Sequence, residues 1–173
     1  MGLFVVDVES NGPIPPDFSM ICFGAVFIGD NGDLSQTFYG KTSPLVGASC
    51  DAAALAISGI SQEEHATFDP PIIVMHEFCT WIEAVNKGGR PIMMSDNIAY
   101  DWQWINYYFH HFLGTNPFGY SGRRISDLYC GVVGDMRAQW KHLRKTKHDH
   151  NPVNDAKGNA EAFLQIVKLG LKL

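Results

Sequence analysis

The sequence has few cysteines, and no two of them are closely spaced. The four are Cys22, Cys50, Cys79 and Cys130. Zinc sites and the disulfide frameworks of small secreted proteins need paired or clustered cysteines. The scattered histidines (His65, His76, His110 and His111) add no zinc motif, because the adjacent pair points to different helix faces. We therefore expect free, mostly buried thiols and a cytoplasmic location.

Long apolar runs are also absent. No stretch approaches the roughly 20 apolar residues of a membrane-spanning helix. The N-terminus, MGLFVVDVE, has no positively charged segment and carries two acids within nine residues. We interpret it as a strand and not as a signal peptide. The sequence thus predicts no membrane partner.

An excess of positive charge is missing, since the formal net charge is −5. This total argues at first against a nucleic-acid partner. However, five of the thirteen Lys and Arg residues form a run just before His150, with no acid among them: Arg137, Lys141, Arg144, Lys145 and Lys147. The run is either solvated surface or a patch that contacts phosphates. In the second case we expect Lys147 to contact the substrate.

The first part of the chain has the pattern of an antiparallel meander. Residues 3–9 alternate as a strand, and a Gly/Pro-rich loop leads to a second apolar strand at about 20–28. Residues 30–33, Asp-Asn-Gly-Asp, form a strong hairpin signal. A third strand is therefore expected at about 34–40.

The rest of the chain predicts helices with one short strand. We expect short pieces and loops over 42–70, a buried strand at 90–95, and four helices, at about 71–86, 98–113, 126–140 and from Asn151-Pro152 onward. Asn151 is a good N-cap with proline at the first helical position. Without repeats or linkers, residues 1–173 should form one α/β domain, with a mixed sheet flanked by helices.

Asp7 and Glu9 are the first candidate site residues. Two positions apart on a strand, their side chains project to the same face. That face otherwise carries Leu3 and Val5. Two carboxylates in a partly desolvated place are costly unless a cation neutralises them, and hard oxygen ligands suit Mg²⁺ or Mn²⁺. The alternative is a strand that simply ends in solvent.

Asp101 is the second candidate. On the expected helix it shares one stripe with apolar residues, namely Ile98, Ile105, Tyr108 and Phe112. A carboxylate in such a stripe is seldom left unpaired. A salt bridge or a backbone cap would also explain it. Asp96 is a rival ligand, although a turn or strand end accounts for that residue.

His150 and Asp155 are the third candidate pair. Asp155 lies in the first turn of the last helix, where the positive helix end favours a carboxylate. His150 precedes that helix and can lean over the same region. Histidine exchanges protons near neutral pH, which suits proton abstraction from water. Helix capping with a surface histidine is the alternative.

Taken together and in this order, these residues resemble the DEDDh exonuclease family. The pattern is an acid pair on the first strand, an acid on a middle helix, and His-x4-Asp opening the last helix. Asn97 and Tyr100-Asp101 resemble the family's middle motif. Residues 57–61 resemble its segment after the third strand, and residues 125–127 resemble the stretch before its later helices. The run HNPVNDAKGNAEA is most similar to small bacterial and phage exoribonuclease-like members. Asp96 stands where many relatives have His, and Pro152 where Ala is frequent.

The resemblance implies a ribonuclease H-like fold and a two-metal hydrolase with 3′-5′ exonuclease activity. Two divalent cations, Mg²⁺ or Mn²⁺, would be bound by Asp7, Glu9, Asp101 and Asp155, with Asp7 bridging them. His150 would act as the general base toward the attacking water. The product would be a nucleoside 5′-monophosphate.

The implied partner is the 3′ end of a single-stranded nucleic acid, and RNA is favoured over DNA. The loop from Ser10 to Met20 would bind this end, with contacts from four of its residues and from Asn97; the four are Ser10, Asn11, Phe18 and Met20. Hydrophobic packing is the alternative for Phe18 and Met20. The aromatic helix WQWINYYFHHF also suggests a homodimer interface.

Two other functions fit the same residues. The metal site could hydrolyse small nucleotides or other small phosphoesters. The chain could also be a non-catalytic nucleic-acid-binding module that keeps the fold. Such a module would be expected to lack one or more of the five residues, and all five are present.

Overall fold

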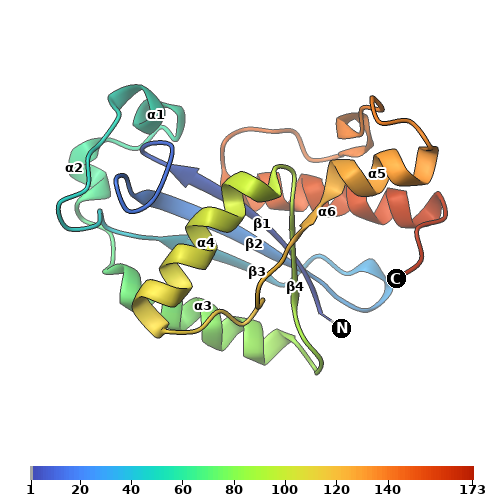
Figure 1. The fold of residues 1–173 in the computed structure, drawn as a ribbon, viewed down its shortest axis with the longest axis horizontal. Helices are drawn as coiled ribbons and strands as arrows, with labels where there is room; N and C mark the ends of the chain where they lie inside the picture. Colours follow the sequence, from blue (N-terminus) through green and yellow to red (C-terminus); the bar gives the residue numbers. More distant parts are fainter. Residues whose placement is uncertain (1) are drawn as a thin grey trace.

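The fold is a five-stranded mixed sheet between two layers of helices. The structure is a computed structural model and describes residues 2–173. The strands are β1 (Leu3–Ser10), β2 (Met20–Ile28), β3 (Thr37–Lys41), β4 (Ile92–Ser95) and β5 (Arg123–Arg124). The helices are α1 (Ala52–Ile57), α2 (Gln62–His65), α3 (Pro71–Val85), α4 (Ile98–Leu113), α5 (Ile125–Val133) and α6 (Pro152–Lys168), with 3₁₀ turns η1 (Asp30–Gly32) and η2 (Lys141–Leu143). Figure 1 shows their arrangement.

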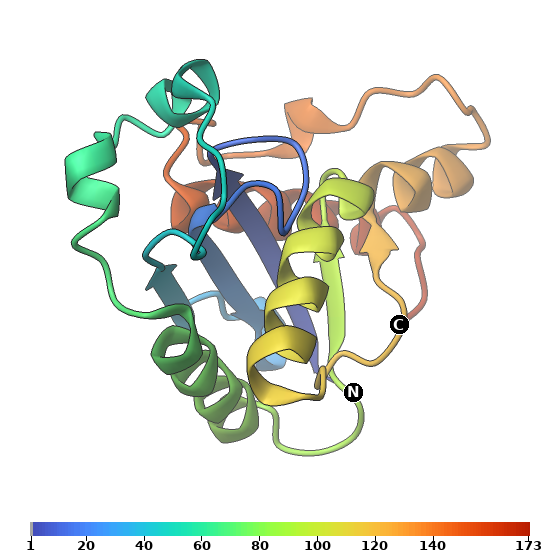
Figure 2. The same ribbon diagram turned by 60° about the vertical axis from the view of Figure 1, so that its left-hand side comes forward.

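The strand order is β3-β2-β1-β4-β5, which places β1 at the centre. β1 pairs with β2 and β2 with β3 in antiparallel fashion, so the predicted meander is confirmed. β4 lies parallel to β1, and β5 lies parallel to β4. Figures 1 and 2 show α3 and α4 on one face of the sheet and α6 on the other. The predicted α/β fold with a mixed, helix-flanked sheet is confirmed.

Strand β1 contributes to a hydrophobic core on each face of the sheet. Phe4, Val6 and Val8 belong to the core shared with α3 and α4. Leu3 and Val5 belong to the second core, which includes the buried face of α6. Because side chains alternate along a strand, Asp7 and Glu9 continue the α6 side of β1. The sheet thereby directs both carboxylates toward the start of α6.

Three predicted elements differ from the structure by two or more residues at one end. The strand expected at 90–95 begins only at Ile92. The helix expected at 126–140 ends at Val133, because Gly134 takes a left-handed conformation (φ 72°) and its N–H bonds to the carbonyl of Cys130. The chain then continues irregularly to Trp140, which is buried in the second core. Strand β3 begins at Thr37, because η1 and the residues after it occupy the preceding positions.

The cysteines differ in part from the expectation of mostly buried thiols, because only two of the four are buried. All four cysteines are free; Cys22 and Cys130 are buried, whereas Cys50 is exposed and Cys79 is half-buried. Within residues 2–173, no helix combines the length and apolar character needed to cross a bilayer.

Candidate active site

Three of the predicted carboxylates converge at one end of the central strand. One oxygen each of Asp7, Glu9 and Asp155 lie within 4.8 Å of one another. Asp7 and Glu9 come from β1, and Asp155 comes from the first turn of α6. Asp155 is fully buried. Residues nearly 150 positions apart in the sequence therefore share one site.

Asp101 approaches the same strand from the opposite helix layer. It lies in the first turn of α4 and is buried, with 4% of its surface exposed. Its Oδ1 accepts a hydrogen bond of 3.0 Å from the backbone N–H of Val8, the residue between Asp7 and Glu9. The core-facing position expected from the helical stripe is confirmed. Asp101 is anchored beside the other three carboxylates through the β1 backbone.

The electrostatics of this cluster disfavour ionised carboxylates without a cation. Burial, followed by the charges of Asp101, Asp155 and Glu9, raises the pKa of Asp7 well above its ordinary value. Burial raises the pKa of Asp101 to about 7, against the hydrogen bonds from Ser95 and Val8. Burial also raises the pKa of Glu9, although the nearby His150 opposes the shift. Four hard oxygen donors in such surroundings fit a divalent cation such as Mg²⁺ or Mn²⁺.

The carboxylate of Asp155 also has protein partners on both oxygens. Its Oδ1 accepts a hydrogen bond of 2.8 Å from Nη2 of Arg144. Its Oδ2 lies 2.8 Å from Nδ1 of His148 and accepts a 3.1 Å hydrogen bond from the backbone N–H of His150. The segment before α6 thus surrounds this carboxylate.

Two histidines, not one, lie beside the carboxylates. Nδ1 of His150 is 3.6 Å from Oε1 of Glu9, and the rings of His148 and His150 meet edge to face at 4.4 Å between centroids. Both side chains are about half exposed, so they can reach solvent. The sequence pattern singled out His150 alone. The only signal for His148 was its position two residues earlier in the run HDH.

Helix α6 begins where the sequence predicts. The side chain of Asn151 accepts hydrogen bonds from the backbone N–H groups of Val153 (3.1 Å) and Asn154 (3.3 Å), which makes it the N-cap. Pro152 follows at the first helical position. This cap sets the start of the helix and places Asp155 in its first turn.

Gly24 on β2 allows the start of α6 to lie directly on the sheet. It pairs with Asp7 in the register, and a Cβ at this position would overlap the backbone of Pro152 and Val153. We expect Gly24→Ala to destabilise the protein by about 1–3 kcal/mol, as overpacking does. By displacing Asp155, it should also lower the nuclease activity that the DEDDh resemblance implies. Thermal unfolding and a nuclease assay would measure both effects.

Gly131 provides the matched control for this substitution. It lies in α5, and a Cβ there would meet no atom within 4 Å. We expect Gly131→Ala to stabilise the protein by up to about 1 kcal/mol because alanine has the higher helix propensity. Unchanged stability of Gly24→Ala would show that α6 can shift without cost.

The structure changes the interpretation of the loop before β2. Met20 is fully buried in the first core, and its N–H donates to the hydroxyl of Tyr108 at 2.8 Å. The burial of Met20 favours the alternative of hydrophobic packing over the expected contact with substrate. Phe18 is half-buried, packs against the first core and lies beside Gly12.

Ser10 and Asn11 hold this loop in shape. The hydroxyl of Ser10 lies 2.6 Å from the hydroxyl of Tyr100 and donates to the carbonyl of Gly12. Oδ1 of Asn11 accepts a 2.7 Å hydrogen bond from the N–H of Ser19. Both residues are buried, so their polar side chains are used within the protein.

The remaining predicted contacts lie at the surface, but the basic run is divided. Asn97 and Lys147 are exposed. Nζ of Lys141 pairs with Asp96 at 2.9 Å, and Arg144 is turned inward toward Asp155. The run is therefore not one continuous phosphate-contacting surface. A sequence pattern could not distinguish the inward arginine from its exposed neighbours.

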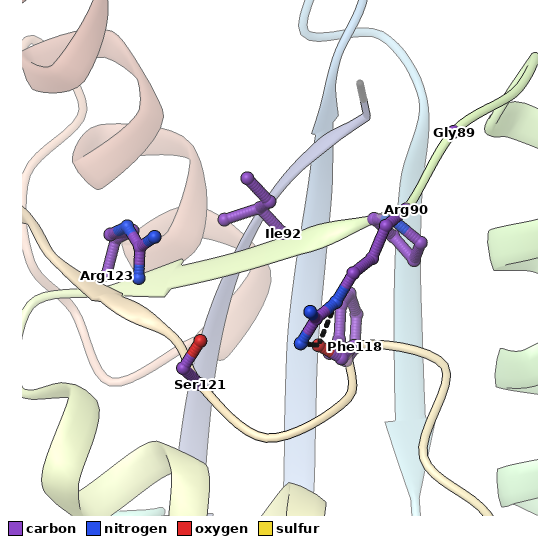
Figure 3. A pocket seen from close by; sticks show the side chains of 7 residues that line it. Gly89, Arg90, Ile92, Phe118, Ser121 and Arg123 are labelled. Atoms are coloured by element: carbon purple, nitrogen blue, oxygen red, sulfur yellow. Dashed lines mark hydrogen bonds between the residues drawn. The ribbon is translucent and has the colours of Figure 1, made fainter.

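A separate cavity of about 330 Å³ lies between the start of β4 and the segment before β5 (Figure 3). Arg90 reaches across it and donates two hydrogen bonds to the carbonyl of Phe118, while Arg123 and Ser121 line the other side. None of the predicted site residues lines this cavity.

Comparison with known proteins places this arrangement in a family. A family model described as the 3′-5′ exoribonuclease Rv2179c-like domain matches residues 3–167. The chain belongs to the Rv2179c-like family. A curated relative from Escherichia coli, the 3′-5′ DNA exonuclease Cap18, is 35% identical, over 96% of this chain and 92% of its own length. The predicted class, a 3′-5′ exonuclease, is thereby confirmed for this Rv2179c-like protein.

Solved structures of several nucleases share the fold of this chain. The nuclease domain of 3′hExo, described as a DEDDh family member bound to rAMP, has a TM-score of 0.79 at 16% identity and covers 99% of this chain and 94% of that chain. Cell-death related nuclease 4 has a TM-score of 0.80 at 15% identity, covering 98% and 64%. E. coli Exonuclease I with a dA16 oligonucleotide has a TM-score of 0.71 at 16% identity, covering 96% and 40%. These likenesses confirm the predicted ribonuclease H-like fold.

Proposed function

We propose that this protein hydrolyses the terminal phosphodiester bond at the 3′ end of a single-stranded nucleic acid with two divalent cations, releasing nucleoside 5′-monophosphates. The observation that carries the proposal is the convergence of Asp7, Glu9 and Asp155, with Asp101 anchored on the intervening backbone. Membership in a 3′-5′ exoribonuclease domain family supports the direction of cleavage.

The four carboxylates are the proposed cation ligands, and Mg²⁺ or Mn²⁺ is the proposed ion. Two such ions would change the formal charge of the protein from −5 to −1. When bound, they would neutralise charge on the phosphate and stabilise the attacking and leaving oxygens. The raised pKa of Asp7 fits this role, because a cation is what makes four close carboxylates tolerable.

The side chains of the protein would then divide the remaining work. Asp7 is central in the cluster and would contact both ions, while Glu9, on the His150 side, would orient the attacking water. His150 would accept the proton of that water through a ring nitrogen, since its side chain is half exposed beside Glu9. Asp101 and Asp155 would complete the ligand set.

The proposed substrate is a single-stranded 3′ end, with RNA preferred. The description of the family names exoribonuclease activity, whereas the E. coli relative is named a DNA exonuclease. Exposed Asn97, half-buried Phe18 and exposed Lys147 are the proposed contacts. Ser10 and Asn11 would act by shaping the loop that carries Phe18.

A labelled-strand assay tests this function. Matched RNA and DNA strands, each labelled at the 3′ or the 5′ end, would be incubated with Mg²⁺, Mn²⁺ or EDTA. We expect the 3′ label to be released first as a mononucleotide, the 5′-labelled strand to shorten stepwise, and RNA to be degraded faster. EDTA should abolish the activity, because the carboxylates alone cannot stabilise the charge of the reacting phosphate.

Other outcomes of the assay would assign a different function. Activity in EDTA or internal cleavage would contradict the proposed mechanism. Hydrolysis of free nucleotides without strand degradation would favour a small-phosphoester hydrolase. Strand binding without cleavage under every metal condition would favour a non-catalytic module. Faster degradation of DNA would overturn only the RNA preference.

A further inference from the structure

Arg144 makes a buried contact with one of the proposed metal ligands. Its Nη2 donates to Oδ1 of Asp155 at 2.8 Å and lies 3.4 Å from the backbone carbonyl oxygen of the same residue. Only 8% of the Arg144 side chain is exposed, and the Asp155 side chain is fully buried. A guanidinium in this position restricts the rotation of the carboxylate, because a charge-assisted hydrogen bond is directional.

Gly158 makes this approach possible. It lies one turn after Asp155 in α6, and a Cβ there would be 2.5 Å from Nε of Arg144 and 2.7 Å from the carbonyl oxygen of Thr146. Glycine inside a helix costs up to about 1 kcal/mol relative to alanine. The close packing of residues 144–146 against the helix accounts for a glycine at this buried position.

Glu161 fixes the same segment one turn further along. Its Oε2 accepts hydrogen bonds from the backbone N–H groups of Lys145 (2.9 Å) and Thr146 (2.7 Å). Its Oε1 accepts a third, from the hydroxyl of Thr146 at 3.1 Å. One carboxylate thus attaches the backbone of this segment to α6.

Three positions of α6 face the same segment because of their spacing. Asp155, Gly158 and Glu161 are three residues apart and lie on one side of α6. They face residues 144–150, a segment that we call the strap. The strap begins with Arg144 on Asp155 and ends with His150, whose N–H also donates to Asp155.

We propose that Arg144 is a positioning residue, held by the strap, that fixes the carboxylate of Asp155 for binding of the divalent cation. This inference rests on the proposed metal-dependent function. Arg144 acts through Asp155 and does not contact the nucleic acid. Its neighbour Lys145 is exposed and uses only its backbone N–H on Glu161, so the two adjacent cations have different roles.

Divalent-cation binding by substituted proteins tests the proposal. Arg144→Met keeps much of the side-chain volume but removes the guanidinium, and Lys145→Met removes the same charge from the exposed neighbour. Mn²⁺ affinity would be measured by titration calorimetry and by the rise in melting temperature with added Mn²⁺. We expect Arg144→Met to weaken Mn²⁺ binding by about 10–100-fold, as loss of a residue that orients a metal ligand does. Lys145→Met should bind Mn²⁺ as the unsubstituted protein does.

Whether Arg144→Met weakens or tightens Mn²⁺ binding shows whether Arg144 positions Asp155 or simply repels the cation. If Arg144 mainly repelled the cation, its removal would tighten Mn²⁺ binding, and the proposal would be wrong. If Arg144 instead contacted phosphates, Arg144→Met would leave Mn²⁺ binding unchanged and would reduce the salt dependence of oligonucleotide binding by about one unit of slope. Either result overturns the proposal.

Glu161→Gln tests the strap without touching Asp155 or removing Arg144. We expect Glu161→Gln to weaken Mn²⁺ binding as Arg144→Met does, but by a smaller factor. The guanidinium of Arg144 is kept in this variant, and only its position becomes less fixed. This variant decides the question if Arg144→Met does not fold. Unchanged Mn²⁺ affinity in folded Glu161→Gln would then contradict the proposal.

The unsubstituted protein distinguishes this inference from the proposed function. If it binds no Mn²⁺ at millimolar concentration, the metal site itself is wrong. If it binds Mn²⁺ and Arg144→Met binds equally well, the metal site stands and only the role of Arg144 fails.

Discussion

Asp7→Asn is expected to lower exonuclease activity by about 10³-fold or more while raising the stability of the metal-free protein. The first effect follows because the proposed bridging carboxylate supports several kcal/mol of charge stabilisation in the transition state, and about 1.4 kcal/mol corresponds to tenfold in rate. The second follows because desolvation of the partly buried Asp7, followed by the charges of Asp101, Asp155 and Glu9, raises its pKa. Activity with Mg²⁺ and thermal unfolding in EDTA would measure the two effects.

The gain in stability of metal-free Asp7→Asn should be small but measurable as a shift in melting temperature. Relief of roughly 1 kcal/mol of repulsion would raise the melting temperature by about 2–4 °C in a domain of this size. Glu77→Gln removes an exposed carboxylate from α3 and should change neither quantity. A metal-free Asp7→Asn protein that melts below the unsubstituted one would contradict the electrostatic account of the site.

The same carboxylates predict how stability depends on pH without metal. The pKa of Asp101 is raised from 3.8 to about 7, and that of Asp7 is also raised. The folded protein therefore binds more protons than the unfolded chain between these values. In EDTA, the contribution of these two carboxyl groups to the free energy of unfolding should be largest below about pH 4 and should be lost as the pH rises through about 7. Asp7→Asn should flatten this decline, and saturating Mn²⁺ should oppose it.

His150→Ala is expected to reduce the exonuclease rate by roughly 10²–10⁴-fold, the usual contribution of a general base. Mn²⁺ binding should be almost unchanged, because the four carboxylates and the contacts of Arg144 remain. The rate would be measured at neutral pH with saturating metal, and Mn²⁺ affinity by calorimetry. A full rate at neutral pH would show that His150 is not the base.

His148→Ala is the matched comparison, since it removes the same ring from a neighbouring position. His148 lies 2.8 Å from Asp155, whereas His150 lies 3.6 Å from Glu9. We therefore expect His148→Ala to weaken Mn²⁺ binding and to lower the rate less than His150→Ala does. The reverse order of rates at saturating metal would assign the proton transfer to His148.

Much of the fold could be predicted because its signals are local. The side-chain alternation of β1 identified both of its faces, and the stripe through Ile105 and Tyr108 identified helix α4 with the bounds that the structure has. Errors arose where a local signal was weaker than the tertiary context. Gly134 ends α5 early, and the apolar Trp140 is buried without belonging to a helix.

The candidate site could likewise be predicted only where its sequence signals are local. Asp7 and Glu9 could be assigned to one face from a spacing of two, and Asp155 to a helix start from the Asn151-Pro152 cap. Their proximity could not be derived from spacing alone, because it depends on β1 and α6 packing through Gly24. The resemblance to the DEDDh family supplied that connection. The burial of Met20 was likewise undecidable, since an apolar residue beside a loop can face either the core or a substrate.

The sequence by itself determined the order of the elements and the faces that carry carboxylates, because periodicity and capping are properties of neighbouring residues. It also indicated the family, because the order of the motifs can be followed along the chain. Only the tertiary structure decided which side chains meet. It divided the basic run between an exposed Lys147, a Lys141 paired with Asp96, and an Arg144 buried on Asp155. The physical reason is that adjacent lysines and arginines look alike in sequence, whereas burial beside a carboxylate arises from contacts with a distant helix.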